Sequence, residues 1–352
     1  MMATPLNHTG HERISPEQAL ALAREAPLHE LCSRALSARQ NRFGKKAFYI
    51  YNQHLNFTNI CQNACRFCAF GKRAGDQGAY TYTPDEIRER ILARITEPIQ
   101  EVHIVGGLNP DLSYEYYLDC IRAVKELRPT AKVKAFTAVE VSFLARTYGR
   151  SIREVLKDFR SAGLDALPGG GAEVFSPKLR KDLCPEKISG EEWLRVHEEA
   201  HTQGIPTNAT MLFGHIETWE DRIDHLAALR DLQDRTGGFR CFIPLPYQPA
   251  NNPLQAPGPD GIDIIRLIAV SRLFLDNIDH IKAYWVMTGM KLAQVALWAG
   301  ADDLDGTLVE EKVGHAAGAR GPKGLTIEEL RTAITQAGFE PVERDTYFER
   351  MK

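Results

Sequence analysis

The sequence has no stretch of about 18 apolar residues, the length that a membrane-spanning helix requires. Its opening, MMATPLNHTGHERISPEQ, lacks the basic region and apolar stretch of a secretory signal peptide. Neither positive nor negative charge is in large excess: the formal net charge is −3, and the isoelectric point is near 6.4. These absences predict a cytoplasmic protein with no membrane span and no nucleic-acid partner.

Cysteine is scarce, with seven residues in 352, and the odd number argues against a framework of disulfides. Three of the seven nevertheless lie close together in CQNACRFC, as Cys61, Cys65 and Cys68. A structural zinc site usually has four Cys or His ligands, whereas three thiolates suit a [4Fe–4S] cluster with one iron open to another ligand. We therefore predict such a cluster on these thiolates, with a zinc or purely structural cluster site as the alternative.

After residue 50, short segments rich in β-forming residues alternate with longer amphipathic segments, and eight of each can be counted. Helix start signals open the amphipathic segments, such as Thr83 and Pro84 in TPDEIRERILARI. Eight β-then-α units predict an α/β fold, a parallel (βα)8 barrel of the TIM type, with a doubly wound open sheet as the alternative. The expected strands are residues 54–59, 101–107, 132–140, 164–170, 207–214, 239–246, 281–287 and 302–309.

The barrel is expected to span residues 51–337, between two short flanking regions. Residues 1–50 are expected to form an N-terminal helical extension, in which the helical segment 15–42 begins at Ser15 and Pro16 and caps the bottom of the barrel. Residues 338–352 are expected to form a short C-terminal tail that adds a final strand.

The barrel frame places the cysteines. Cys61 directly follows the first expected strand, so the cysteine loop should lie at the C-terminal mouth, where barrel enzymes keep their active sites. Glycines end two further strands, Gly106 and Gly107 in IVGGLNP and Gly169 and Gly170 in LPGGGAEVF. Because glycine has no side chain, these turns let the backbone approach a bound ligand closely.

Three polar residues near the ends of expected strands are further candidates. Glu173 in LPGGGAEVF could accept hydrogen bonds from ribose hydroxyls, and Glu140 is a similar candidate. His215 is a candidate proton carrier or anion ligand, with a hydrogen-bonded structural histidine as the alternative.

Charged residues within expected strands point to the ligand. Lys134, Arg240 and Lys282 lie in such strands, where a positive charge is costly unless a substrate carboxylate or an internal acid pairs with it. The acidic run DDLDGTLVEE, residues 302–311, is interpreted either as part of the mouth or as a helix-capping or solvated loop.

The three-cysteine loop, with the aromatic Phe67 before its last cysteine and a strand directly before it, resembles the signature of the radical SAM superfamily. This resemblance implies a [4Fe–4S] cluster whose open iron binds S-adenosyl-L-methionine, and a cleavage that yields methionine and a 5′-deoxyadenosyl radical. Leu108 stands where many members carry Glu, so we expect contact through the backbone there. The implied cofactor-binding residues are Phe67, Gly106, Gly107, Glu140, Gly169, Gly170 and Glu173.

Longer segments, above all CPEKISGEEW and GADDLDGTLVEE, resemble the aminofutalosine synthase family of the futalosine route to menaquinone. The resemblance implies a transferase that adds the adenosyl radical to 3-[(1-carboxyvinyl)oxy]benzoate. The aryl group then migrates and the enolpyruvyl carboxylate leaves as bicarbonate, giving 6-amino-6-deoxyfutalosine. His215 and Glu173 are the catalytic candidates.

Other functions stay open beside this one. The related cyclic dehypoxanthine futalosine synthase and the tyrosine-using half of F0 synthase share the cysteine motif, and a non-catalytic iron–sulfur electron carrier is a different class. The expected partners are a small dicarboxylate substrate, a low-potential electron donor such as flavodoxin or ferredoxin, and a second copy of the chain in a homodimer.

Overall fold

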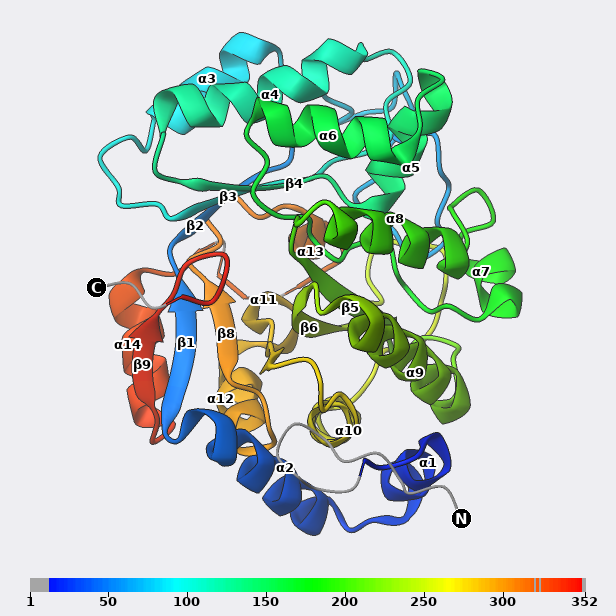
Figure 1. Ribbon diagram of the computed structural model, residues 1–352, viewed down its shortest axis with the longest axis vertical. Helices are drawn as coiled ribbons and strands as arrows, with labels where there is room; N and C mark the ends of the chain where they lie inside the picture. The colour runs from blue at the N-terminus through cyan, green and yellow to red at the C-terminus, as the bar shows by residue number, and fades with distance from the viewer. Residues whose placement is uncertain (1–12, 320, 323, 350–352) are drawn as a thin grey trace.

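Nine strands and fourteen helices make up the regular structure of residues 13–319, 321–322 and 324–349, which the computed structural model describes (Figure 1). The strands are β1 (Lys46–Ile50), β2 (Asn52–Leu55), β3 (Glu101–Ile104), β4 (Lys132–Ala135), β5 (Thr207–Phe213), β6 (Phe239–Pro246), β7 (His280–Ile281), β8 (Asp303–Gly306) and β9 (Glu340–Glu343). The helices are α1 (Pro16–Glu25), α2 (Leu28–Phe43), α3 (Pro84–Leu92), α4 (Tyr114–Leu127), α5 (Ala138–Thr147), α6 (Ile152–Ala162), α7 (Pro177–Leu183), α8 (Gly190–Thr202), α9 (Trp219–Thr236), α10 (Gly261–Phe274), α11 (Trp285–Thr288), α12 (Met290–Trp298), α13 (Val313–Ala316) and α14 (Ile327–Gln336).

Parallel pairing carries the strands around a closed barrel. β1 and β2 are two halves of one strand, of which β1 pairs with β8 and β2 pairs with β3. β3 pairs with β4, single bridges at Ala166 and Leu167 continue the circuit to β5, and β5, β6 and β7 follow. A bridge from Lys282 to Asp303 closes the circuit at β8. The expected (βα)8 barrel is therefore confirmed.

Several boundaries differ from the expectation. The third strand ends at Ala135 instead of residue 140, because Thr137 caps α5 and residues 138–140 form its first turn. The first strand occupies residues 46–55 instead of 54–59, so the expected extension 1–50 wrongly includes β1 of the barrel; residues 1–12 of that extension lie outside the described residues. The fourth strand is reduced to single bridges, because Pro168 has no N–H to continue the ladder. The seventh expected strand, 281–287, gives way to α11 after Ile281.

Both flanking regions pack where they were expected. α1 begins at Ser15 with a capping box, and α1 and α2 lie beside α10 at the bottom of Figure 1. The guanidinium of Arg39 in α2 is buried and donates to the carbonyl oxygens of Ala301 (3.1 Å) and Gly44 (2.6 Å), next to the starts of β8 and β1. The extension thus caps the N-terminal end of the barrel, and the tail adds β9 in parallel to β1.

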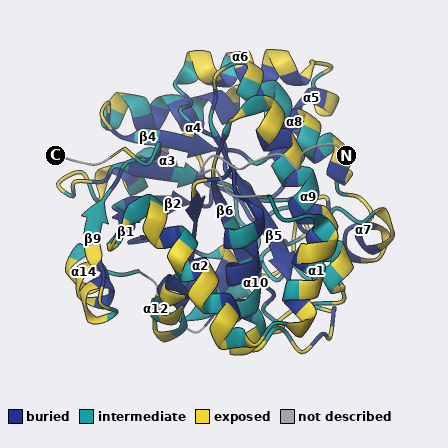
Figure 2. Cartoon of the chain, turned by 60° about the horizontal axis from the view of Figure 1, so that its bottom comes forward, coloured by how far each residue is buried: buried dark blue, intermediate teal, exposed yellow. Residues whose placement is uncertain are grey.

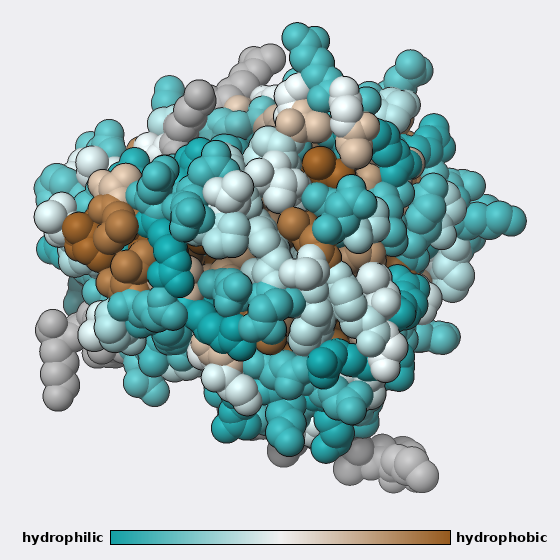
Figure 3. Space-filling view, turned by 90° about the horizontal axis from the view of Figure 1, so that it is seen from above, coloured by the Kyte–Doolittle hydropathy of each residue, from teal (hydrophilic) through white to brown (hydrophobic). Residues whose placement is uncertain are grey.

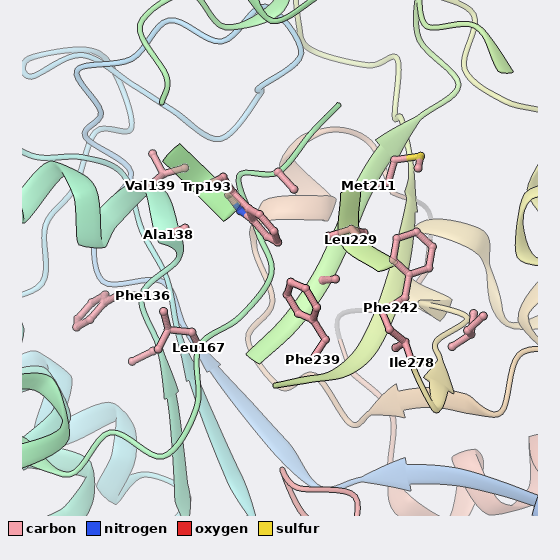
Figure 4. Close-up of a cluster of buried hydrophobic side chains, with 14 of the residues drawn as sticks. Phe136, Ala138, Val139, Leu167, Trp193, Met211, Leu229, Phe239, Phe242 and Ile278 are labelled. Atoms are coloured by element: carbon pink, nitrogen blue, oxygen red, sulfur yellow. The ribbon is translucent and has the colours of Figure 1, made fainter. Parts of the chain in front are cut away.

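The core lies between the strands and the ring of helices. Figure 2 shows buried strands inside helices whose outer faces are exposed. In Figure 4 the ring of Phe136 lies after β4, that of Trp193 belongs to α8, and those of Phe239 and Phe242 belong to β6; all four are part of this core. The face in Figure 3 is mostly hydrophilic, with apolar colour in small patches. This packing holds the carboxyl ends of the strands together as a rigid frame.

Candidate active site

A cavity of about 490 Å³ opens at the C-terminal ends of the strands. Its walls include the cysteine loop, both glycine turns and side chains from inside the barrel. Among the candidate residues, the cavity brings together Cys61, Cys65, Phe67, Cys68, Gly106, Gly107, Glu140, Gly169, Gly170 and Glu173. The mouth of the barrel is therefore the candidate active site, as the cysteine spacing predicted.

The cysteine loop is held by backbone contacts on both of its sides. The N–H of Cys61 donates to the carbonyl oxygen of Lys72 (2.9 Å), and the N–H of Cys68 donates to that of Cys65 (3.0 Å). The Arg73 guanidinium donates to the carbonyl oxygen of Cys61 (2.8 Å). All three cysteines are free and half-buried, so their thiols are available as ligands on one wall of the cavity.

The spacing of these thiols bears on the kind of metal centre. Within the described part of the chain, no three His, Cys, Asp or Glu side chains converge as the ligands of a single metal ion do. A [4Fe–4S] cluster takes one thiolate on each of three irons and leaves the fourth iron open, which suits three thiols beside an open cavity.

In the turn after β3, atoms of other residues lie very close to the backbone of two glycines. A methyl group on Gly107 would lie 2.2 Å from the carbonyl oxygen of Ile60 and 3.1 Å from Cβ of Cys61. A methyl group on Gly106 would lie 2.7 Å from the Phe57 ring. Only glycine fits at these two positions, so the turn forms the support on which the cysteine loop rests.

Glu140 contacts this turn from the first turn of α5. One carboxylate oxygen accepts from the N–H of Gly106 (3.0 Å) and the other from the N–H of Thr137 (2.7 Å). Burial raises the pKa of Glu140 to about 7, against these hydrogen bonds, which favour the ionised form. Glu140 therefore lines the cavity while it also ties α5 to the glycine turn.

Glu173 has a partner that sequence reasoning missed. Its carboxylate lies 2.6 Å from Nζ of Lys187, and both side chains are about nine-tenths buried. Lys187 also lies 5.2 Å from the centre of the Phe67 ring. The sequence does contain a signal for this partner. The segment CPEKISGEEW carries a lysine three residues after Cys184. This ion pair places one carboxylate and one ammonium group against the cysteine loop.

Contacts from neighbouring elements hold the glycine turn that precedes Glu173. Trp193 donates from its indole N–H to the carbonyl oxygen of Gly170 (3.2 Å), and Thr210 donates to that of Gly169 (2.6 Å). A methyl group on Gly169 would lie 2.6 Å from the carbonyl oxygen of Asn208. Close packing against β5 is thus one reason for glycine here.

His215 does not join the other candidates, contrary to the catalytic role expected for it. Its side chain is fully buried and is not part of the cavity wall. Its Nε2 lies 3.1 Å from the carbonyl oxygen of Leu212, and its Nδ1 lies 2.8 Å from a carboxylate oxygen of Glu217 and 2.7 Å from the backbone nitrogen of Ile216. Glu217 accepts from the N–H groups of Gly214 and His215. The structural alternative is therefore the one that the contacts support.

The strand-borne cations fall into two groups. Lys134 and Lys282 line the cavity and pair with internal acids, Lys134 with Glu101 (2.5 Å) and Lys282 with Asp305 (2.6 Å). Arg240 is exposed on the outside of the barrel. The acidic run 302–311 is not a solvated loop, because Asp302, Asp303, Asp305 and Glu311 are buried.

Comparison with known proteins identifies the family. Residues 55–229 match the Radical SAM superfamily, and residues 236–352 match the CofH/MqnC C-terminal region. The chain belongs to the radical SAM superfamily. It is a radical SAM enzyme of the CofH/MqnC type.

Similar proteins in this superfamily differ in their reactions. The chain is 44% identical to the aminodeoxyfutalosine synthase of Thermus thermophilus, over 97% of this chain and 93% of that protein. It is 41% identical to the 5-amino-6-(D-ribitylamino)uracil–L-tyrosine 4-hydroxyphenyl transferase of Methanopyrus kandleri, over 92% and 89%. It is 39% identical to the cyclic dehypoxanthine futalosine synthase of Streptomyces coelicolor, over 96% and 86%.

Solved radical SAM structures share the fold. Methylornithine synthase (PylB) is 19% identical, with a TM-score of 0.73 over 94% of both chains. The hydrogenase maturase HydG from Carboxydothermus hydrogenoformans is 16% identical, with a TM-score of 0.74 over 96% of this chain and 78% of that chain. These likenesses support the barrel architecture.

Radical SAM enzymes use a [4Fe–4S] cluster and S-adenosylmethionine, and these are the cofactors of this enzyme. Cys61, Cys65 and Cys68 would hold the cluster, which supplies reductive cleavage of S-adenosylmethionine when bound. The two glycine turns would border the S-adenosylmethionine, and the barrel interior would hold the second substrate. In the described part of the chain, every helix is too short or too polar to cross a membrane.

Proposed function

We propose that this enzyme is an aminodeoxyfutalosine synthase, the aminofutalosine synthase to which its sequence is similar. The 44% identity to the Thermus thermophilus enzyme over nearly the full length of both chains carries this proposal. The adenosyl radical adds to the enol double bond of 3-[(1-carboxyvinyl)oxy]benzoate, the aryl group migrates from oxygen to carbon, and bicarbonate leaves. S-adenosylmethionine is consumed, because the product keeps the adenosine.

The cavity supports the proposal through the segments that carry the resemblance. CPEKISGEEW contributes Lys187, and GADDLDGTLVEE contributes Asp305 and Glu311. Lys134 and Lys282 line the cavity together with their acidic partners Glu101 and Asp305, so its interior is polar, as a substrate with two carboxylates requires. A low-potential flavodoxin or ferredoxin would supply the electron in the cytoplasm.

Tyrosine-dependent 4-hydroxyphenyl transfer is the second candidate function, because the identity to the Methanopyrus kandleri enzyme is 41%. That reaction would require L-tyrosine and 5-amino-6-(D-ribitylamino)uracil and would release 5′-deoxyadenosine. The two functions therefore differ in the fate of the adenosyl group.

An anaerobic assay separates them. The reconstituted enzyme is incubated with S-adenosylmethionine, a low-potential reductant and 3-[(1-carboxyvinyl)oxy]benzoate, and products are read by mass spectrometry. A product that keeps the adenosyl group and has lost one carboxylate supports the proposal. Free 5′-deoxyadenosine with unchanged benzoate rejects it, and the same assay with the tyrosine substrates then tests the second candidate. Cys65→Ala protein is the control for cluster-independent chemistry.

A further inference from the structure

Four side chains of the barrel interior form one layer, which we call the inner layer: His54, His103, Lys134 and Lys282. His54, His103 and Lys134 are register partners on the adjacent strands β2, β3 and β4, and Lys282 directly follows β7. All four line the cavity. His103 precedes Gly106 by three residues, which places the layer about 10 Å deeper along the strand than the glycine turn.

The charges of the inner layer are already balanced. Lys134 pairs with Glu101, Lys282 pairs with Asp305, and Arg344 pairs with Asp303. All six side chains are buried. An extra negative charge in this layer would have no counter-charge, and a buried unpaired charge is costly. A ligand carboxylate there requires a new positive charge.

The two histidines can supply that charge. Their rings lie against each other, with centroids 4.6 Å apart. Nε2 of His54 is buried and has no hydrogen-bond partner among the described residues. Burial lowers the pKa of both imidazoles, so both are neutral near pH 7. The charged and titratable groups that face the pair are Glu101, Lys134, Lys282, Asp305 and Glu311.

The rest of the cavity suits an aromatic ring. Val105, Ile243, Leu245 and Met287 contribute apolar surface beside the polar inner layer. A ligand that fits both has an aryl body and an anionic end. In the proposed substrate the enol carbon must lie near the cluster at the mouth, so the ring carboxylate, at the other end of the molecule, lies deepest.

We propose that the inner layer binds the ring carboxylate of the benzoate substrate, and that the His54–His103 pair takes up one proton from solvent as it binds. This inference rests on the proposed function and extends it to the binding step. The proton turns one imidazole into an imidazolium, which pairs with the incoming carboxylate and keeps the layer neutral. Specificity for an aryl carboxylate over a phenol follows from this requirement.

Calorimetry tests the proton uptake directly. 3-[(1-Carboxyvinyl)oxy]benzoate is titrated into the cluster-loaded enzyme with S-adenosylmethionine and no reductant, at pH 7.5, in phosphate and in Tris buffer. We expect uptake of about one proton for each ligand bound, seen as a buffer-dependent enthalpy. 3-Hydroxybenzoate, which keeps only the ring carboxylate, should show the same uptake. Binding of either compound without proton uptake overturns the inference.

Variants locate the proton. The double variant His54→Gln and His103→Gln should lose the uptake and bind the substrate about 10- to 100-fold more weakly, because a charged hydrogen bond is lost. Arg240→Gln, on the exposed face of β6, is the matched control and should bind as the wild type does. Iron content confirms that each variant is folded.

The outcomes separate this inference from the proposed function. Wild-type enzyme that forms the adenosylated product and binds its substrate without proton uptake rejects the inference alone. If the histidine double variant binds the substrate with unchanged affinity and unchanged proton uptake, the inference is rejected and the proposed function is not. Wild-type enzyme that neither binds nor converts the benzoate rejects both.

Discussion

The carboxylate of Glu140 accepts a hydrogen bond from the backbone N–H of Gly106 at 3.0 Å. This bond joins the first turn of α5 to the turn after β3, and the second carboxylate oxygen closes the capping box with Thr137. Gly107, the next residue, lies against Ile60 and Cys61. Glu140 therefore supports the cluster loop indirectly, through Gly106 and Gly107, and is not itself one of the expected cluster ligands.

Glu140→Ala should destabilise the protein more than an ordinary capping-box substitution. It leaves two buried N–H groups without acceptors, so we expect a loss of about 2–4 kcal/mol in the free energy of unfolding. Glu154 closes an equivalent but exposed capping box in α6, and Glu154→Ala should cost about 1 kcal/mol. Anaerobic urea denaturation measures both. Equal losses would show that the Gly106 contact contributes nothing.

The stability of the wild type should depend on pH through Glu140. Its pKa rises from 4.5 to about 7 on folding because the carboxyl is buried. Folding therefore takes up a proton in this window, and the folded state loses stability as pH rises from 4.5 to about 7, by up to ~3 kcal/mol. The free energy of unfolding of Glu140→Gln should lack this decline. Parallel pH profiles of the two proteins would contradict the assignment.

Gly107→Ala should reduce cluster occupancy. The added methyl group would lie 2.2 Å from the carbonyl oxygen of Ile60, so the backbone that leads into Cys61 must shift. Gly261→Ala is the control, because its methyl group would lie 3.7 Å from the nearest atom, an ordinary contact. Iron and sulfide content after reconstitution is the measurement. Full occupancy in the Gly107 variant would mean that the loop adapts.

Substitution of any cluster cysteine by Ala should remove the cluster and leave the barrel folded. Cys61, Cys65 and Cys68 lie in a loop at the mouth of the barrel and outside its strands. Cys120→Ala, Cys184→Ala and Cys241→Ala should keep the cluster, since these thiols stand outside the motif. Iron content and far-ultraviolet circular dichroism distinguish the two sets. Loss of iron in the second set would show that the ligands are misassigned.

His215→Gln should lower stability and leave S-adenosylmethionine cleavage nearly unchanged. The imidazole is fully buried outside the cavity and lies against Leu212, Ile216 and the ring of Tyr247. Its loss therefore disturbs packing beside the cavity wall. Thermal unfolding and the rate of 5′-deoxyadenosine or product formation provide the two readouts. A stable variant that has lost turnover would restore the catalytic role that the sequence suggested.

Much of the site could be predicted because its determinants are local. The spacing of Cys61, Cys65 and Cys68 brings three thiols to one loop whatever the rest of the chain does. A strand before them and the βα period place that loop at the barrel mouth. The glycines at 106 and 107 were expected to let a ligand approach the backbone, whereas the close approaches that the structure shows are to Phe57, Ile60 and Cys61.

The inner layer and the place of His215 could not be predicted in this way. His54, His103 and Lys134 meet because three strands far apart in the sequence share one register, and a shift of one residue would turn each side chain to the other face. Arg240 faces outward for the same reason, whereas Lys187 reaches Glu173 because the loops before α7 and α8 pack together. The sequence alone determined the cluster ligands, the βα order and the radical SAM signature, because these depend on short spacing. Strand register and packing decided which charges face the cavity, because those depend on contacts across the whole barrel.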